Sequence, residues 1–418
     1  MSVLPVARGA RPWPVALAGM VAMAVAMGIG RFAFTPLLPI MLQEGALDLA
    51  ASSWLASANY LGYLVGAVLC TLQPALWRCL GWASDINAPA LVRLGLVATV
   101  VLTAGMALHW PAAWPLLRFA AGVASALVFV YLSGWCLTRL AQLQVPEMGA
   151  LIYIGPGAGI VVSGLAASGI VALNGSAAVG WLVFGALAAG LTALVWPVLV
   201  RGAAPQQRSA TPDANPDPVR AAPPPNRAEL ALLALAYGLA GLGYIISATF
   251  LPVIARQAIP GSFWLDLFWP IFGLGIMLGA LLASRIRSAS DLRLRLIACY
   301  VLQACGVALG LVWPSSAGFA LGSLLLGMPM TAITYFAMQE ARRLAPRQPA
   351  GLIGLLTALY GLGQVAGPPL TAAFLARTAS ADAGFSYALV VAAGALLLGA
   401  LLFGAMLRRF PVRAGASA

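Results

Sequence analysis

The feature that most constrains this chain is a succession of long apolar runs, each long enough to cross a lipid bilayer. A membrane-spanning helix needs about 20 mainly apolar residues, and glycine or proline can interrupt it where neighbouring groups satisfy the freed backbone. On this basis we expect twelve spans, near residues 14–41, 51–72, 90–109, 113–138, 148–172, 179–200, 229–254, 264–284, 294–313, 316–339, 350–375 and 384–407. The sequence therefore predicts an all-α membrane protein with twelve transmembrane helices.

Composition supports lipid as the surrounding solvent. Only 8% of the 418 residues are charged and 62% are hydrophobic, whereas about 25% of a soluble globular chain is charged. A chain with so few charges cannot cover its surface in water, but lipid accepts apolar side chains on the outside. The net charge of +12 comes from arginines that lie mainly between apolar runs and not on one basic face. This distribution is typical of topology signals and argues against nucleic-acid binding.

The arginines also predict how the chain is oriented. With the N-terminus inside, nearly all arginines outside the spans fall on the inner side, and only Arg256 and Arg377 fall outside. Cytoplasmic loops carry such an excess of basic residues, so we expect an even number of spans with both termini cytoplasmic. The exclusive use of arginine as the basic residue suggests a GC-rich bacterial genome, and hence the bacterial cytoplasmic (inner) membrane.

A proline-rich segment divides the chain into two halves. Residues 202–228 contain prolines and charges but no apolar run, which predicts an extended cytoplasmic linker. We therefore expect an N-terminal six-helix bundle over 1–201 and a C-terminal six-helix bundle over 229–418. The halves are weakly related, because residues 28–39 align with 241–252 through a shared pair of glycines and a shared Leu-Pro. Two related six-helix repeats are a known plan of transporters.

Three local motifs lie within this plan. In the fourth span, Arg118 is followed four residues later by glycine, which resembles the Arg-x-x-x-Gly motif of the major facilitator superfamily. In the fifth, Gly155, Pro156 and Gly159 resemble the Gly-Pro-x-x-Gly core of its antiporter motif. Residues 28–39 resemble the start of its YbfB-like branch. The resemblance covers the whole chain and implies two pseudo-symmetric bundles, secondary transport of a small solute, and a role for Arg118 in proton coupling.

Arg31 is the sharpest functional candidate among the residues. It lies about 17 residues into the first expected span, far from either membrane surface on a rise of about 1.5 Å per residue. A charge there costs at least about 2.5–3.5 kcal/mol, and such charges usually face an interior cavity. We expect Arg31 to contact an anionic or polar substrate or to gate transport, and the alternative is a structural arginine bound to helix-end carbonyls. Arg118 lies nearer the outer end of its span, where it could instead extend to the membrane surface.

Other polar residues within the spans extend this candidate site. Asn59 and Tyr63 are one helical turn apart on one face, and Tyr244 and Gln364 lie in spans of the second half. Our predicted set of substrate-binding or gating residues is Arg31, Asn59, Tyr63, Arg118, Tyr244 and Gln364. The motif at Gly155, Pro156 and Gly159 is expected to bend the fifth span or to permit close helix packing.

Groups that could couple transport to protons are scarce. No carboxylate lies deep in any expected span, and proton coupling usually needs a titratable group whose pKa is brought towards neutrality. We name Arg118 and Asp266 as coupling candidates, and His109 and Glu340 are further titratable groups near span ends. Asp266 has a plain alternative as a hydrated residue at the membrane surface.

The sequence leaves two transport functions open. The first is a secondary active transporter of a small organic solute, by proton-linked efflux. The alternative is uptake or exchange of a small organic anion coordinated by buried arginines. An enzyme is not expected because one peripheral histidine and no buried acid form no catalytic cluster, and the cysteines lack zinc-site spacing. We expect a monomer whose partners are the lipid bilayer, the substrate and protons, with no cofactor, metal or nucleic acid.

Overall fold

A computed structural model describes residues 12–79, 87–202, 226–261, 263–286, 291–345 and 349–411. Within this part of the chain, twelve helical segments are long and apolar enough to cross a membrane, which confirms the predicted fold class. Residues 203–225, which make up most of the predicted linker, lie outside the described residues.

The N-terminal half contains the first six spans. The first span is divided into α1 (Pro12–Met23), the π-helical segment η1 (Ala24–Arg31) and α2 (Phe34–Gln43). The fifth span joins a 3-10 segment, η3 (Pro146–Ile154), to α6 (Gly155–Ala172). The remaining elements of this half are α3 (Leu49–Cys79), α4 (Ala88–Gly105), the short 3-10 segment η2 (Pro111–Ala113), α5 (Trp114–Gln142) and α7 (Ala177–Gly202).

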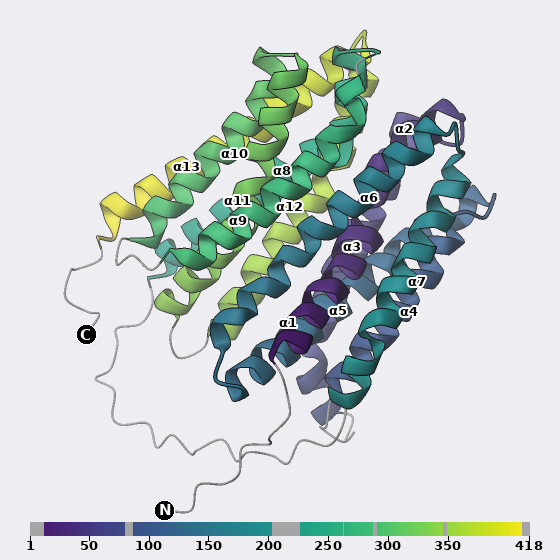
Figure 1. Cartoon of the computed structure of the whole chain (residues 1–418). Coiled ribbons are helices and arrows are strands. Elements are labelled where there is room, and N and C mark those ends of the chain that lie inside the picture. The colour runs from purple at the N-terminus through teal and green to yellow at the C-terminus, as the bar shows by residue number, and fades with distance from the viewer. Residues whose placement is uncertain are drawn as a thin grey trace, which may run out of the picture.

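The C-terminal half contains the other six spans. They comprise α8 (Arg227–Ala258), η4 (Phe263–Leu267) with α9 (Phe268–Arg285), α10 (Leu292–Val312), α11 (Ser316–Leu344), α12 (Pro349–Arg377) and α13 (Ala381–Arg409). Figure 1 shows this half as one group of inclined helices beside the group formed by α1 to α7. Between the halves, α3 packs on α12, α6 on α9 and α2 on α8.

An even number of spans brings Pro12 and Arg409 to the same side of the membrane (Figure 1), called here the termini side, and the opposite side is called the far side. The outer surface between the two sides is apolar. On α4, for example, Leu94, Val97 and Val101 are exposed while Val92 and Leu96 are buried. This helical spacing directs one apolar face inward and another outward, an arrangement that is stable against lipid but not against water.

Ion pairs hold the termini side of the C-terminal half together. Arg293 is fully buried and donates to both carboxylate oxygens of Asp291, at 2.6–3.2 Å, and to the carbonyls of Met406 and Phe410 at 3.2 and 2.7 Å. The bond to Phe410 satisfies a carbonyl at the end of α13, whereas the Met406 carbonyl also accepts from the Phe410 N–H at 2.9 Å. Burial raises the pKa of the Asp291 carboxyl, but the hydrogen bonds and charge of Arg293 outweigh it and hold that pKa below its ordinary value.

Glu340 belongs to the same network. Arg343 donates to Glu340 at 2.6 Å and to Glu229 at 2.9 Å, and Arg293 lies 3.9 Å from Glu340. The network joins α8, α10 and α11. Glu340, one of the titratable groups noted in the sequence, is therefore ion-paired at the end of the bundle.

Glycines allow the helices of the N-terminal half to touch through their backbones. A Cβ atom placed at Gly122 on α5 would lie 2.1 Å from the carbonyl oxygen of Asn59 on α3. A Cβ at Gly62 on α3 would lie 1.9 Å from the carbonyl oxygen of Phe119. Small residues permit such close approach in membranes. Gly122, the glycine of the Arg-x-x-x-Gly motif, therefore allows α5 to pack closely against α3.

We predict that Gly122→Ala destabilises the protein by about 1–3 kcal/mol, because the added methyl group must push α3 and α5 apart. Gly134→Ala, on the same helix, is the matched control because a Cβ there would meet no atom within 4 Å. Thermal unfolding of the two variants in detergent measures the difference. Equal unfolding temperatures would contradict the backbone contact.

Candidate functional site

The first span breaks at the candidate residue Arg31. Its helix widens into the π-helical segment η1, which ends at Arg31, and a turn at Phe32 and Ala33 precedes α2. Pro36 has no N–H to donate to the Phe32 carbonyl, and Thr35 N–H donates to that carbonyl instead, at 3.2 Å. Segments of π-helix are rare and occur frequently at functional sites.

Arg31 lies at the contact between the two halves. Its side chain is buried, with a residue exposure of 2%. Nη2 donates a 2.6 Å hydrogen bond to Oε1 of Gln364 on α12, in the other half of the chain. The guanidinium carbon lies 3.9 Å from the ring centre of Tyr63, and 5.4 and 5.5 Å from those of Tyr60 and Phe32. Arg31 is therefore held by one neutral amide and a set of aromatic rings.

Gln364 links Arg31 to a row of tyrosines in the C-terminal half. Its Nε2 donates to the hydroxyl of Tyr244 on α8, so its Oε1 faces Arg31. Tyr244 stacks with Tyr360, with ring centres 5.8 Å apart, and Tyr360 stacks with Tyr237 at 4.7 Å. We call Tyr237, Tyr244 and Tyr360 the tyrosine row. It begins next to the Arg31–Gln364 hydrogen bond.

Arg118 has a different role from Arg31. It is buried, with 3% exposure, and donates from Nη1 to the carbonyl of Gly30 at 3.2 Å and from Nη2 to the carbonyl of Arg31 at 2.8 Å. Asn59 in turn donates from Nδ2 to the Arg118 carbonyl at 2.9 Å. Arg118 points into the bundle and not to the membrane surface. The contact with helix carbonyls that was an alternative for Arg31 is made by Arg118.

The six predicted site residues thus form one connected group. Arg31 donates a hydrogen bond to Gln364, and Gln364 donates one to Tyr244. The ring of Tyr63 faces the Arg31 guanidinium. Arg118 donates to the backbone carbonyl of Arg31, and Asn59 donates to that of Arg118. The group draws on both halves of the chain.

The sequence did not predict the hydrogen bonds by which hydroxyl groups join the halves around this group. They form the pairs Tyr60–Thr249 at 2.9 Å, Thr35–Ala248 carbonyl at 3.1 Å and Ser57–Val365 carbonyl at 2.9 Å. All of these residues lie in the far-side parts of their spans. The only sequence signal was spacing, since Thr35 follows Arg31 by one helical turn.

The site is cationic. Among the described residues neither Arg31 nor Arg118 forms an ion pair, and the ion pairs found there lie at span ends. The Nε atoms of both arginines are buried and have no hydrogen-bond partner. An uncompensated buried charge is costly. A negatively charged ligand therefore gains from binding here.

The other coupling candidate lies apart from this site. Asp266 belongs to η4 at the far side, where it pairs with Arg256 and where its carbonyl accepts from Ser168 at 3.1 Å. His109 is exposed in the connection between α4 and η2. Of the two coupling candidates, Arg118 alone belongs to the site.

The glycine–proline motif packs the fifth span on the broken segment of the first. Cβ atoms at Gly155 and Gly159 would lie 2.2 and 2.3 Å from the carbonyl oxygens of Met20 and Ala24. Pro156 stands in the first turn of α6, where its missing N–H breaks no helical bond. The motif therefore forms a backbone-to-backbone contact with the end of α1 and the start of the π-helical segment.

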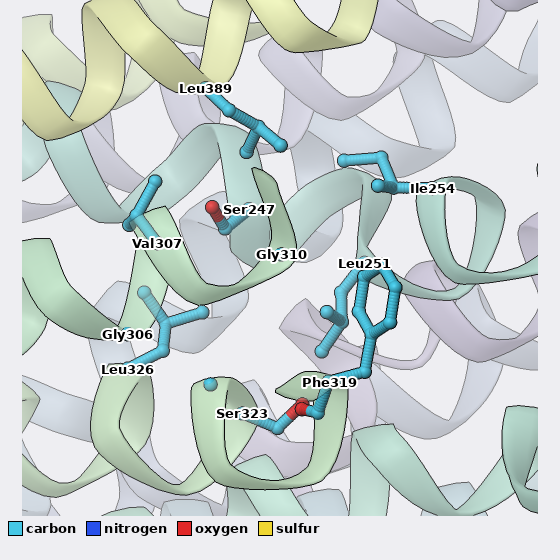
Figure 2. Close-up of a pocket in the computed structure, with 11 residues that line it drawn as sticks. Ser247, Leu251, Ile254, Gly306, Val307, Gly310, Phe319, Ser323, Leu326 and Leu389 are labelled. Carbon is cyan, nitrogen blue, oxygen red and sulfur yellow. The ribbon is translucent and has the colours of Figure 1, made fainter. Parts of the chain in front are cut away.

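A separate small cavity lies within the C-terminal half (Figure 2), enclosed mainly by apolar side chains of α8, α10, α11 and α13. Its volume is about 20 Å³. The residues that line it are Ser247, Leu251, Ile254, Gly306, Val307, Gly310, Phe319, Gly322, Ser323, Leu326 and Leu389. This volume suits about one water molecule, so the cavity is too small for an organic solute.

Solved structures and a family comparison identify the class of protein. The fold is similar to the crystal structure of the nucleoside transporter NupG, with a TM-score of 0.62, 15% identity, and coverage of 95% of this chain and 99% of that chain. The crystal structure of a point mutant of NupG gives a TM-score of 0.69 at 15% identity, with coverage of 94% of this chain and 99% of that chain. At this identity the likeness shows the fold alone.

The family follows from the sequence. Residues 23–404 match the family described as the uncharacterised MFS-type transporter YbfB, and the chain belongs to this family of the major facilitator superfamily. A search of curated proteins gives no match. The chain is therefore a multi-pass transporter and not an enzyme.

We predict that Arg118→Lys destabilises the protein although it keeps the charge. Lysine offers a point charge, whereas the planar guanidinium reaches two carbonyls at once. Loss of one charged hydrogen bond costs about 1.5–3 kcal/mol. Thermal unfolding in detergent measures this, with Arg377→Lys at the exposed far-side end of α12 as the control. Wild-type stability in Arg118→Lys would mean that the two carbonyl bonds are dispensable.

Proposed function

We propose that the protein carries a small organic anion across the membrane by alternating access, and that Arg31 contacts the negative charge of the solute. One observation carries this proposal: Arg31 is buried at the contact between the halves among neutral groups, with no carboxylate partner among the described residues. The function is uptake or exchange of the anion.

The place of Arg31 supports a transport role. A solute bound to Arg31 from the N-terminal half also meets Gln364 and Tyr244 from the C-terminal half. In transporters of this plan, two bundles rock around a site near the middle of the membrane. A ligand that touches both bundles changes the relative stability of the two arrangements, because its contacts differ between them.

Charge balance also supports an anion. Within the chain, the Arg31 charge is offset by the Gln364 amide dipole and by aromatic rings, and by no carboxylate among the described residues. A monoanion replaces these weak contacts with an ion pair, and a buried ion pair with good hydrogen bonds is far less costly than a lone buried charge. The loaded site is then neutral overall at Arg31. Movement of the loaded bundles is favoured over movement of the empty ones, which favours exchange.

Proton-linked efflux of a small organic solute is the second candidate. The Arg-x-x-x-Gly motif at Arg118 and the glycine contacts of Gly155 and Gly159 support it, because they resemble antiporter motifs. In this function Arg118 takes part in coupling. Proton coupling also needs an acidic group near Arg118. Either the solute supplies it, or a carboxylate of the chain approaches Arg118 in the opposite arrangement of the bundles.

We further infer that the protein acts as a monomer in a bacterial cytoplasmic membrane, with both termini in the cytoplasm. The excess of arginine in the connections on the termini side supports this orientation. The proline-rich segment between Gly202 and Arg227 would then lie in the cytoplasm.

We predict that Arg31→Ala and Arg31→Lys lower organic-anion flux. Alanine removes the charge, and flux falls about 10- to 100-fold because a charged hydrogen bond is worth about 1.5–3 kcal/mol. Lysine keeps the charge and retains part of the flux. The measurement uses purified protein in liposomes, in which uptake of labelled solute reports flux and a trapped pH dye reports proton movement, screened with organic anions and with lipophilic cations. Arg377→Ala, which removes an exposed arginine at the far side, is the control.

The same assay separates the two functions. Anion flux that depends on Arg31 and moves no protons supports anion transport and excludes proton antiport. Proton movement evoked by a lipophilic cation, with no response to anions, would overturn the anion proposal in favour of efflux.

A further inference from the structure

The contact between Arg31 and Gln364 shows what kind of group the site accepts. The Oε1 atom of Gln364 is an sp² oxygen that accepts from Arg31 at 2.6 Å. A carboxylate offers the same oxygen geometry together with a full negative charge, and it forms stronger hydrogen bonds with guanidinium than an amide does. A solute carboxylate therefore has both the shape and the energy to displace the Gln364 side chain from Arg31.

The number of free cationic groups limits the charge of the solute. Arg118 already donates a hydrogen bond from each of its two terminal nitrogens, one to the carbonyl of Gly30 and one to the carbonyl of Arg31. Arg31 has one neutral side-chain acceptor, Gln364, and an Nε without a partner. Arg31 is thus the guanidinium with donors left for a ligand, and it forms a direct ion pair with a single carboxylate. A second carboxylate would meet only Arg118, whose two terminal nitrogens are already bonded to carbonyls, so it would lack a direct partner in a desolvated site.

Aromatic surfaces flank this position in both halves. In the C-terminal half, Tyr360 lies one helical turn before Gln364, within the stacked tyrosine row. In the N-terminal half, Tyr63 lies under Arg31 and contacts Phe129 edge-on, with ring centres 6.4 Å apart. Tyr63 and Tyr360 are partly exposed, whereas Tyr237 and Tyr244 are buried. The two partly exposed rings thus lie close to the Arg31–Gln364 hydrogen bond, one in each half of the chain.

We propose that the transported solute is an aromatic monocarboxylate. Its carboxylate takes the place of Gln364 on Arg31, and its ring lies against Tyr360 and Tyr63. This inference rests on the proposed transport of an organic anion and narrows it to one substrate class. Gln364 is then a specificity-determining residue, because a solute binds only if it competes for Arg31 better than a neutral amide does.

The first test compares four probes with purified protein in detergent at neutral pH, by ligand-induced thermal stabilisation and direct binding. Benzoate and cyclohexanecarboxylate have the same charge and a six-membered ring, but only benzoate is aromatic. Benzamide lacks the charge, and phthalate carries two. Benzoate is expected to bind about 2- to 10-fold more tightly than cyclohexanecarboxylate, since an aromatic contact adds about 0.5–1.5 kcal/mol beyond apolar burial. Benzamide and phthalate bind more weakly than benzoate.

The second test uses variants that act on the ring and on the charge separately. Tyr360→Leu is expected to abolish the preference for benzoate while cyclohexanecarboxylate binding remains, and Tyr360→Phe keeps the preference. Gln364→Glu places a carboxylate beside Arg31 within the chain, so both acids lose affinity. Tyr387→Leu, at an exposed tyrosine on α13, is the control and leaves the affinities unchanged.

The outcomes distinguish this inference from the function on which it rests. Equal affinity for benzoate and cyclohexanecarboxylate, with both lost in Arg31→Ala, overturns the aromatic class and leaves anion transport standing. Binding of both acids that persists in Arg31→Ala overturns the role of Arg31 itself. Binding of neither acid, with Arg31-dependent flux of another anion in liposomes, also overturns the aromatic class alone.

Discussion

The two hydrogen bonds from Arg118 to the carbonyls of Gly30 and Arg31 are the interaction on which the site depends. A helix that breaks inside a membrane leaves carbonyls without donors, and lipid cannot satisfy them. Arg118 supplies donors at the point where the π-helical segment ends. The break in turn allows Arg31 to reach Gln364 in the other half. Arg118 thus binds the backbone from which the Arg31 side chain extends to Gln364.

In the part of the chain that the structure describes, buried charges are paired at the termini side of the C-terminal half but unpaired in the middle of the spans. At the termini side of the C-terminal half, Arg293 and Arg343 are paired with three carboxylates. The middle of the described structure holds two guanidinium groups without a carboxylate. Paired charges stabilise one arrangement of helices, whereas an unpaired charge makes stability depend on a ligand. Within the described residues, the carboxylate partners of arginines therefore lie at the ends of the spans and not beside Arg31 or Arg118.

The fold was largely predictable because its main determinant is local. Each span is a run of apolar residues long enough for the bilayer, and the twelve predicted runs match the twelve helical segments. The candidate site was predictable in part, since polar groups buried in lipid need partners and Arg31, Asn59 and Gln364 stand out in apolar runs. Thr35 and Thr249 did not stand out, because a threonine can satisfy its hydroxyl within its own helix.

The sequence by itself determined the class of protein, the number of spans and the presence of a charge deep in the first span. These are properties of composition along the chain. The tertiary structure decided which arginine binds backbone carbonyls and which one faces the other half. That choice depends on contacts such as Arg31 with Gln364, which are 333 positions apart. The packing of distant helices sets such contacts, and no spacing within one helix encodes them.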